Sequence, residues 1–176
     1  VDVAIINEED RFLETGELGE VVTRSDVMMK GYWKNPEASA LALRDGWLHT
    51  GDVGYFDDDG YLFLMDRSKD MIISGGENIY PREIEEIIIQ HPAIREVAVI
   101  GIPDEQWGES VKAIVVLVPG QHVDEDELIA FCQNYIASYK KPKSVDFVTE
   151  LPKNNYGKIV KRELREPYWK REQREI

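Results

Sequence analysis

The chain has 176 residues, of which 43% are hydrophobic, a net charge of −13 and one cysteine, a composition typical of a globular protein with one or two small domains. A single cysteine excludes an internal disulfide framework and a structural zinc site built on paired cysteines, and it indicates a reducing, cytoplasmic compartment. No apolar run approaches the ~20 residues of a bilayer crossing, so we expect no membrane span.

The charge is unevenly distributed along the chain. Residues 1–138 carry 10 basic and 28 acidic side chains, whereas residues 139–176 carry 11 basic and 6 acidic ones. The acidic body argues against general nucleic-acid binding, because phosphates would be repelled. The basic end could still bind a small polyanion, although charge alone favours a solvated basic helix.

Residues 1–65 predict a small β-rich subdomain. Runs typical of strands occupy Val1–Ile6 and Glu20–Thr23, and two aromatic-rich runs flank the polar tetrad Asp57–Gly60. The tetrad is predicted to be a solvated hairpin turn, because its carboxylates lack the alternate spacing and the final glutamate of a calcium loop.

Residues 71–176 predict a compact α+β domain, joined to the first part by a hinge over residues 66–70. Pro81 opens an amphipathic helix that ends before His91. The later predicted elements are two apolar strands, a helix with a capping box, a short strand and a final helix: Val97–Ile102, Val111–Val118, Asp124–Ile136, Ser144–Thr149 and Ile159–Arg165. Cys132 lies on the apolar face of the capped helix, which favours a buried structural thiol over a nucleophile.

The segment Trp47–Asp52 is the first with chemical potential. Gly51 permits a tight turn, and Asp52 is predicted to stand at the end of a strand. A carboxylate placed there can accept two hydrogen bonds from vicinal ribose hydroxyls. A structural turn aspartate explains the same pattern equally well.

The segment Asp66–Pro81 combines charges at a domain boundary, an apolar run and a glycine pair ahead of a helix. Gly75 and Gly76 would let a ligand approach the backbone closely, although adjacent glycines also occur in ordinary loops. Arg67 fits a ligand contact and an inter-domain salt bridge equally well.

Two further segments carry cations. Leu151–Ile159 is a polar, glycine-containing loop that delivers Lys158, a mobile point charge suited to a phosphate or a developing oxyanion. Tyr139–Lys143 places three lysines beside an aromatic ring, which suits a nucleotide with several phosphates. Taken alone, Lys158 is better explained as an ordinary surface lysine, and a solvated lysine cluster explains the second segment equally well.

Together these segments resemble the adenylate-forming superfamily of acyl-CoA synthetases, peptide-synthetase adenylation domains and beetle luciferase. Thr50–Asp52 is similar to the Thr-Gly-Asp motif of that family, Asp66–Glu85 to its hinge block and Pro152–Leu164 to its catalytic-lysine block. Gly16–Glu20 and Met29–Trp33 resemble the segment that precedes the Thr-Gly-Asp motif. The resemblance covers essentially the whole chain.

The resemblance implies roles for four residues at the nucleotide and the hinge. Asp52 would bind the ribose hydroxyls of ATP or AMP, and Arg67 would contact the same ribose or the phosphate. Lys69 would occupy the hinge position about which the C-terminal domain rotates between two half-reactions. Lys158 would be catalytic, reaching the α-phosphate and the acyl carboxylate during adenylation.

The resemblance to CoA ligases also implies a CoA site. Gly75 and Gly76 would line the pantetheine tunnel, where a side chain would block the thiol. Trp107 would meet the adenine of CoA, and Tyr139, Lys141 and Lys143 would contact its phosphates.

The implied function is that of an acid–CoA ligase, which activates a small-molecule carboxylic acid with ATP and Mg2+ and transfers the acyl group to CoA. The Ser, Thr and Gly-rich phosphate loop of the family and its acyl pocket are absent from the sequence. We therefore expect the end of a large N-terminal domain followed by a C-terminal lid domain, inactive without the missing N-terminal domain. No protein-bound metal site is expected, and apolar surface left by the missing domain would favour a homodimer.

Three alternatives remain open. The chain could belong to an adenylation domain that loads a carrier protein, although Ser74–Ile79 looks more like the CoA ligases. It could also be a non-catalytic module that binds CoA or a partner. A truncated regulatory relative is disfavoured, because Asp52, Arg67 and Lys158 are all retained. The acid itself is not identified by these residues.

Overall fold

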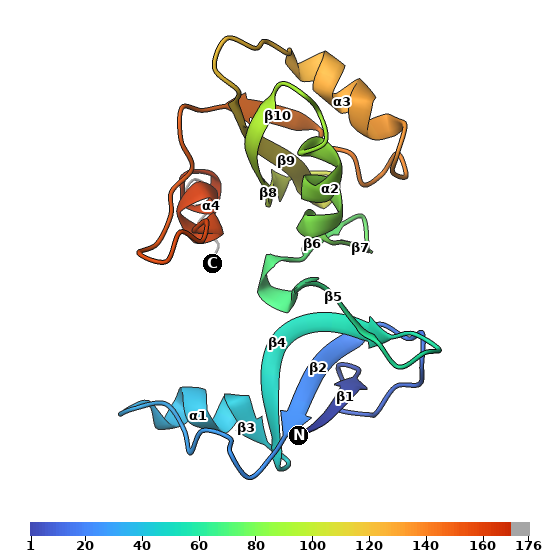
Figure 1. Ribbon diagram of the computed structural model, residues 1–176, viewed down its shortest axis with the longest axis vertical. Coiled ribbons are helices and arrows are strands. Elements are labelled where there is room, and N and C mark those ends of the chain that lie inside the picture. Colours follow the sequence, from blue (N-terminus) through green and yellow to red (C-terminus); the bar gives the residue numbers. More distant parts are fainter. Residues whose placement is uncertain (170–176) are drawn as a thin grey trace. The chain divides into compact units, whose positions relative to one another are not determined.

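The computed structural model describes residues 1–169 and separates into two compact units, Val1–Lys69 and the described residues from Asp70 onward (Figure 1). The boundary lies inside the 66–70 segment that the sequence predicts to be a hinge, and movement about it stays a prediction. None of the helices formed by residues 1–169 has the length and apolar character that a bilayer crossing requires.

The first unit is an antiparallel sheet with strand order β1-β2-β4-β3, and β5 pairs with β4. Its elements are β1 (Asp2–Ile6), β2 (Gly19–Arg24), α1 (Pro36–Ala42), β3 (Leu43–Arg44), β4 (Trp47–Phe56) and β5 (Leu62–Arg67). The β4–β5 hairpin contains the predicted turn, in which Asp57 Oδ1 accepts the amides of Asp59 and Tyr61. Helix α1, which the sequence analysis did not predict, is capped by the Asn35 side chain and opened by Pro36.

The second unit is a mixed sheet with strand order β10-β9-β6-β7, in which β8 pairs with β9 and β10 runs parallel to β9. It follows the short 3-10 turn η1 (Ser68–Asp70). Its elements are β6 (Ile72–Ser74), β7 (Glu77–Ile79), α2 (Pro81–Ile88), β8 (Ile94–Asp104), β9 (Gly108–Leu117), α3 (Glu125–Gln133), β10 (Ser144–Phe147) and α4 (Lys161–Trp169). The chain is therefore α+β, as the sequence predicts.

Both faces of the second sheet are buried, because the residues of β8 and β9 alternate between two apolar clusters. The face that carries Val97 and Val99 packs against Ile84 of α2 and Leu128 of α3. The opposite face, which carries Ala98 and Ile100, packs against α4. This burial explains why the two strands read as nearly continuous apolar runs.

Helix α4 is attached to the sheet by polar contacts as well as by packing. The Tyr168 hydroxyl donates to Asp146, and Trp169 Nε1 donates to the Gly101 carbonyl at 3.1 Å. Burial disfavours the charged form of Asp146, but hydrogen bonds from Lys112 and Tyr168 outweigh it and lower the pKa of this carboxyl below its ordinary value. Helix α4 is thereby held against the sheet of the second unit.

Several predicted elements have different bounds in the structure. The strand predicted to end at Asp52 and the aromatic-rich run predicted before Asp57 are parts of the single strand β4. The final helix begins at Lys161, because Ile159 still pairs with Lys153 in a β-bridge. The helix predicted to open at Pro81 and the capping box at Asp124, whose side chain accepts the Glu127 amide, are confirmed.

Cys132 is fully buried on α3, as predicted. Burial raises the pKa of its thiol to about 11, so the thiolate is scarce at neutral pH. The structure therefore supports a packing role for this cysteine.

Candidate functional site

Strand β4 contains a bulge at Thr50–Asp52. Opposite it on β2, Glu20 pairs with Val53 and Val22 pairs with His49, so β4 has two extra residues between these pairs. Gly51 accommodates the bulge with a φ of +71°, a left-handed value that glycine adopts without steric cost. The expectation that Gly51 makes a turn and that Asp52 ends a strand is therefore wrong, because the strand continues through both residues.

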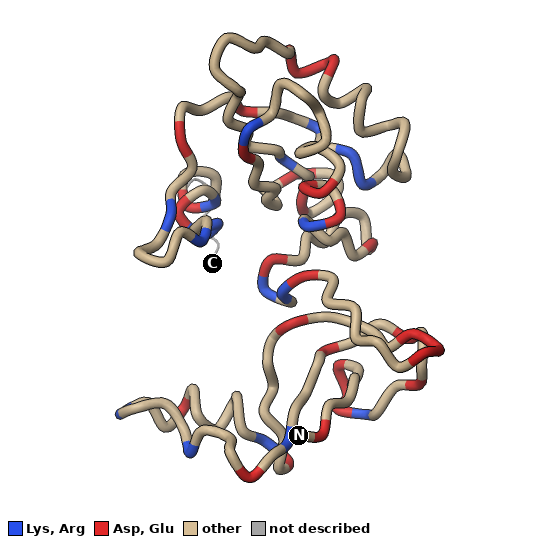
Figure 2. The backbone as a smooth tube through the Cα atoms, viewed as in Figure 1, with Lys and Arg blue, Asp and Glu red and all other residues tan. Residues whose placement is uncertain are grey.

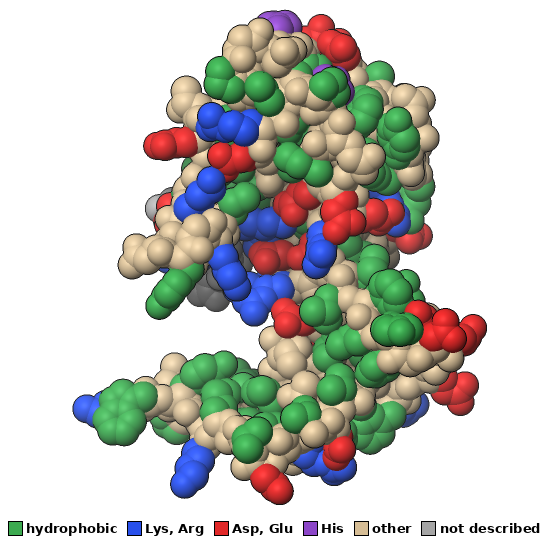
Figure 3. Space-filling view, viewed as in Figure 1, with side chains coloured by type: hydrophobic (Ala, Val, Ile, Leu, Met, Phe, Trp, Pro, Cys, Tyr) green, Lys and Arg blue, Asp and Glu red, His purple; other side chains and the backbone are tan. Residues whose placement is uncertain are grey.

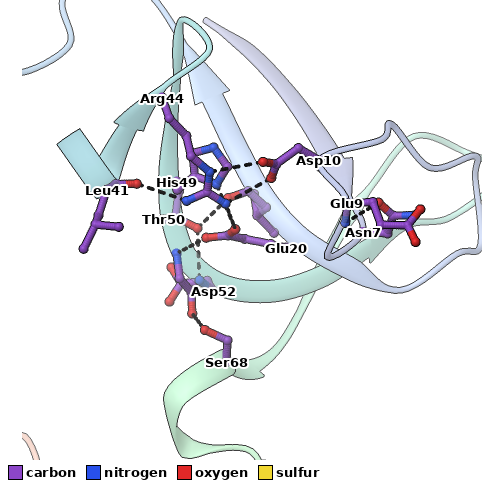
Figure 4. Close-up of polar contacts among 12 residues, drawn as sticks. Asn7, Glu9, Asp10, Glu20, Leu41, Arg44, His49, Thr50, Asp52 and Ser68 are labelled. Atoms are coloured by element: carbon purple, nitrogen blue, oxygen red, sulfur yellow. Dashed lines mark hydrogen bonds and ion pairs between the residues drawn. The ribbon is translucent and has the colours of Figure 1, made fainter. Parts of the chain in front are cut away.

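Two side chains satisfy the amides that the bulge removes from the ladder (Figure 4). Glu20 Oε1 accepts the Gly51 amide at 3.0 Å. The Thr50 hydroxyl donates to the Val21 carbonyl at 2.7 Å and accepts the Asp52 amide at 3.1 Å. The backbone on both sides of the Asp52 Cα is consequently fixed by contacts with β2.

Asp52 and Arg67 are cross-strand partners on β4 and β5. Arg67 Nε donates to Asp52 Oδ1 at 3.1 Å, and the side chains are 34% and 55% exposed for Asp52 and Arg67. Within residues 1–169, Asp52 makes its ion pair with Arg67, and its side chain remains partly exposed. The structure thus brings the two predicted nucleotide-binding residues together.

A second layer of charged residues lies behind the bulge (Figure 4). Glu20 Oε2 lies 2.9 Å from His49 Nδ1 and 3.9 Å from an Arg44 guanidinium nitrogen, and Arg44 pairs with Asp10 at 3.0 Å. The hydrogen bond with Arg44 lowers the pKa of Asp10, and the same bond raises the pKa of Arg44. These contacts are not predictable from the sequence, because Asp10, Glu20, Arg44 and His49 come from separate segments and no spacing relates them.

In the second unit, Gly75 and Gly76 form the turn of the β6–β7 hairpin, with φ of +62° and +86°. A Cβ on Gly75 would lie 2.7 Å from Cε3 of Trp107, and the Gly75 amide donates to the Trp107 carbonyl at 2.9 Å. Apart from its chain neighbours, no atom of residues 1–169 lies within 4 Å of a Cβ built on Gly76. Position 75 thus favours glycine for two reasons: its left-handed backbone and the closeness of the Trp107 ring. The pantetheine contact of either glycine stays a prediction.

Trp107 lies beside Lys143, a residue predicted to contact the phosphates of CoA. The Lys143 ammonium lies 5.4 Å from the Trp107 ring centroid and 3.1 Å from Asp104 Oδ2. Asp104 Oδ1 accepts the amides of Trp107 and Gln106 at 3.0 Å. The bond from the Trp107 amide, with those from Lys143 and Gln106, lowers the pKa of Asp104 despite partial desolvation. An exposed indole and a lysine therefore form one patch beside the hairpin turn.

The rest of the Tyr139–Lys143 segment is divided between structural and exposed side chains. Its lysines are among the basic positions that Figure 2 marks along the backbone. Lys140 Nζ pairs with Glu83 of α2 at 2.7 Å, so this lysine holds the segment to the unit. Tyr139 is exposed and Lys141 is half-buried. Among residues 1–169, no hydrogen bond, ion pair or ring contact links Tyr139 or Lys141 to the patch formed by Trp107 and Lys143.

The loop that carries Lys158 is closed at its base by the β-bridge between Lys153 and Ile159. Asn154 Oδ1 accepts the amides of Tyr156 and Lys158, both at 3.0 Å, and Gly157 has a φ of +79°. Lys158 is exposed in this small turn. Its backbone is therefore held by a local network, while its side chain extends into solvent.

Three lysines of this segment have different surroundings. Lys153 Nζ pairs with Glu96 at 2.5 Å, and Lys161 Nζ pairs with Glu85 at 2.8 Å. Lys158 pairs with no carboxylate among residues 1–169. A hollow of about 570 Å³, lined in part by Gly157 and Arg82, opens beside the loop. Of the three ammonium groups, Lys158 is the one available to an external anion.

Lys69 lies in the η1 turn at the boundary of the two units. The next residue, Asp70, pairs with Arg165 of α4 at 2.7 Å, which attaches the start of the second unit to its last described helix. No group of three metal-ligating His, Cys, Asp or Glu side chains occurs within the described part of the chain. The hinge role of Lys69 stays a prediction.

The first unit also exposes many large apolar side chains, which Figure 3 shows over much of its visible face. They include Phe12, Leu18, Val27, Tyr32, Trp33, Leu41, Tyr61, Leu62, Phe63 and Leu64. This surface is the kind that a further domain or a second copy would cover.

Comparison with known proteins adds a family relationship to this geometry. The model of the AMP-binding enzyme C-terminal domain matches residues 83–158. The long-chain-fatty-acid–CoA ligase FadD13 of Mycobacterium tuberculosis is 52% identical over 95% of this chain and 33% of its own length. The fatty acid–[acyl-carrier-protein] ligase ScoC of Streptomyces coeruleorubidus is 46% identical over 94% of this chain and 29% of its own.

Among solved structures, ATP-bound MatB from Rhodopseudomonas palustris superimposes with a TM-score of 0.90 at 38% identity, over 95% of this chain and 34% of that one. The chain thus spans about a third of the length of the curated relatives it matches.

Proposed function

Because this chain belongs to the adenylate-forming superfamily, we propose that it is the C-terminal third of an enzyme that activates a carboxylic acid with ATP and transfers the acyl group to CoA. The relatives named as CoA ligases support this assignment. The missing N-terminal domain would supply the acyl pocket and the loop that holds the triphosphate.

The ribose contacts of this chain would come from the first unit. The half-exposed Asp52 carboxylate would accept hydrogen bonds from both ribose hydroxyls, and Arg67 would hold that carboxylate and contact the ribose or the phosphate. Mg2+ would accompany the triphosphate and offset its charge.

The observation that carries the proposal is the unpaired Lys158 between two paired lysines. In adenylation, a carboxylate oxygen bonds to the α-phosphorus while the bond from that phosphorus to pyrophosphate breaks. Both reactants are anions, so a cation placed at the α-phosphate offsets their repulsion and the charge that develops. Lys158 is exposed on a fixed backbone and has the mobility this step requires.

The second half-reaction would use the other face of the C-terminal domain. The thiol of CoA bonds to the acyl carbonyl carbon, its proton is released, and AMP leaves with the electron pair of the broken acyl–phosphate bond. Rotation at Lys69 would exchange Lys158 for the turn of Gly75 and Gly76. Trp107 would then meet the adenine of CoA, and Lys143 its phosphates, together with Tyr139 and Lys141.

The experiment is acid-dependent ATP–pyrophosphate exchange by the full-length enzyme across short, long-chain and aromatic acids. Lys158→Ala is expected to lower exchange by about 10²–10³, the typical cost of one preorganised charge contact. Thioester formation from supplied acyl-adenylate should survive this change. The matched control is Lys153→Ala, which removes an ion-paired lysine of the same loop and should leave exchange within about threefold.

Equal loss of both half-reactions in Lys158→Ala would contradict the assignment. No exchange with any acid would favour a non-catalytic module that binds CoA or a partner.

The similarity to a ligase named for an acyl carrier protein supports a second candidate for the thiol that receives the acyl group. The same enzyme would then transfer the acyl group to the phosphopantetheine thiol of that carrier instead of free CoA. Supplying acyl-adenylate with either CoA or a phosphopantetheinylated carrier, and measuring which becomes acylated, separates the two acceptors.

A further inference from the structure

The bulge in β4 creates a problem of hydrogen bonding that one distant side chain solves. A bulge takes amides out of the strand ladder, and a partly buried amide needs another acceptor. At this bulge, the Gly51 amide donates to Glu20 Oε1 at 3.0 Å rather than to a backbone carbonyl of β2 (Figure 4). The Glu20 carboxylate therefore takes the place of the backbone carbonyl that would accept this amide in a regular strand pair.

The Glu20 side chain is itself held in place. Its second oxygen lies 2.9 Å from His49 Nδ1, and the His49 side chain is 6% exposed. The two oxygens thus contact β4 on either side of Thr50, one at His49 and one at Gly51. Arg44, at 3.9 Å, adds a positive charge to the same carboxylate.

The bulge has a point at which it can relax. Gly51, with its φ of +71°, is the residue with the widest choice of backbone conformations, and a Cβ built on it meets nothing closer than Ser68 Oγ at 3.9 Å. Without an acceptor for its amide, this residue would be free to change conformation. Asp52 is the next residue, so its carboxylate would move with it.

We propose that Glu20 is a positioning residue for the nucleotide site: it bridges His49 and the Gly51 amide, and so holds the Asp52 carboxylate where the ribose hydroxyls bind. The role rests on the proposed function, because it needs Asp52 to bind the nucleotide. It depends on the reach of the Glu20 side chain more than on its charge.

The test compares three substitutions in the full-length enzyme, with KM for ATP and kcat measured in the exchange assay. Glu20→Ala removes the acceptor and is expected to raise KM for ATP about tenfold, the size of one hydrogen bond to a charged group. Glu20→Asp keeps the charge but shortens the side chain by one methylene, so it should raise KM similarly. Glu20→Gln keeps the reach, since its oxygen can accept from the Gly51 amide while its amide nitrogen can lie against the His49 ring nitrogen, and KM should stay within about threefold.

The matched control is Glu9→Ala, which removes a carboxylate of the same unit that is 64% exposed and pairs with Arg11. It should leave KM for ATP, KM for the acid and kcat unchanged. Thermal unfolding of each variant identifies any that fails to fold, and the contrast between Glu20→Asp and Glu20→Gln does not require the alanine variant.

Combining each change with Asp52→Ala separates the positioning role of Glu20 from the assignment of Asp52 to the nucleotide site. If Glu20 acts through Asp52, Glu20→Ala should add nothing to the loss caused by Asp52→Ala. If Asp52→Ala raises KM for ATP but Glu20→Ala does not, or if the two losses add fully, the positioning role is wrong and the nucleotide site stands. If Asp52→Ala has no effect on KM for ATP, the assignment of the nucleotide site fails, and the role of Glu20 fails with it.

Discussion

The bulge at Thr50–Asp52 and the loop that carries Lys158 hold their functional side chains in different ways. The bulge is held by residues far away in the sequence, above all by Glu20 on β2. The loop is held mostly by its own residue Asn154, whose side chain accepts two of its amides. The backbone at Asp52 is thus fixed by long-range contacts, whereas Lys158, which the proposed mechanism moves between the two half-reactions, is carried by a local turn.

The largest expected effect comes from comparing Lys158, which has no ion pair within residues 1–169, with Lys161, which has one. Lys161→Met removes the partner of Glu85, where the two side chains are 15% and 21% exposed, and should lower the free energy of unfolding by about 2 kcal/mol, less than for a fully buried pair. Lys158→Met should leave stability unchanged. Urea unfolding of the 176-residue chain measures both, and equal losses would remove the distinction between a structural and an available lysine.

A smaller effect is expected from two glycines with similar backbone conformations. Gly51 and Gly157 have φ of +71° and +79°, and a Cβ would have room at either position. Gly51→Ala should cost about 1–2 kcal/mol of unfolding free energy, because the contacts with Glu20 and β2 hold its backbone in the left-handed conformation. Gly157→Ala should cost less than about 1 kcal/mol, because the loop can adjust. A larger cost at Gly157 would show that the loop is as rigid as the bulge.

Asn154→Ala should have a small effect on stability and a clearer one on rate. The two amides that Asn154 accepts are exposed and can donate to water instead, so the free energy of unfolding should change by less than about 1 kcal/mol. Loss of the turn should lower ATP–pyrophosphate exchange by the full-length enzyme about threefold to tenfold, because Lys158 would sample more positions. Asn155→Ala, in the same loop, is the control, and an equal effect of both changes would argue against a specific role for the Asn154 turn.

The smallest effect concerns the patch at Trp107 in acid. The folded-state pKa of Asp104 lies below its ordinary value of 3.8, so its ionised form stabilises the fold at pH above that value. This contribution should be lost as the pH falls through the lowered pKa. Trp107 becomes less restrained when Asp104 is protonated, so indole fluorescence of the chain should change in that range. In Asp104→Asn the same titration step should be absent.

The sequence predicted much of the second unit because its signals are local. Pro81 opens α2, Asp124 caps α3, and the apolar runs of β8 and β9 match a sheet buried on both faces. The association of Asp52 with Arg67 was expected from the resemblance, and the cross-strand register places them together. Their roles in binding stay predictions.

The course of β4 was not predictable in the same way. A glycine followed by a carboxylate usually marks a turn, and nothing near Gly51 in the sequence shows that Glu20 is available to accept its amide. The strand continues only because β2 lies beside it and supplies that acceptor. Propensity thus favoured a turn, and the tertiary contact kept the strand.

By itself, the sequence determined the element types of the second unit, the burial of Cys132 and the identity of the segments that carry charge, since these depend on neighbouring residues and on periodicity. Only the tertiary structure decided which charges are already paired. Lys140, Lys153 and Lys161 find their carboxylates on α2 or β8, whereas Lys158 finds none within residues 1–169. The physical reason is that an ion pair forms between side chains close in space, and the partners of these lysines lie far away along the chain.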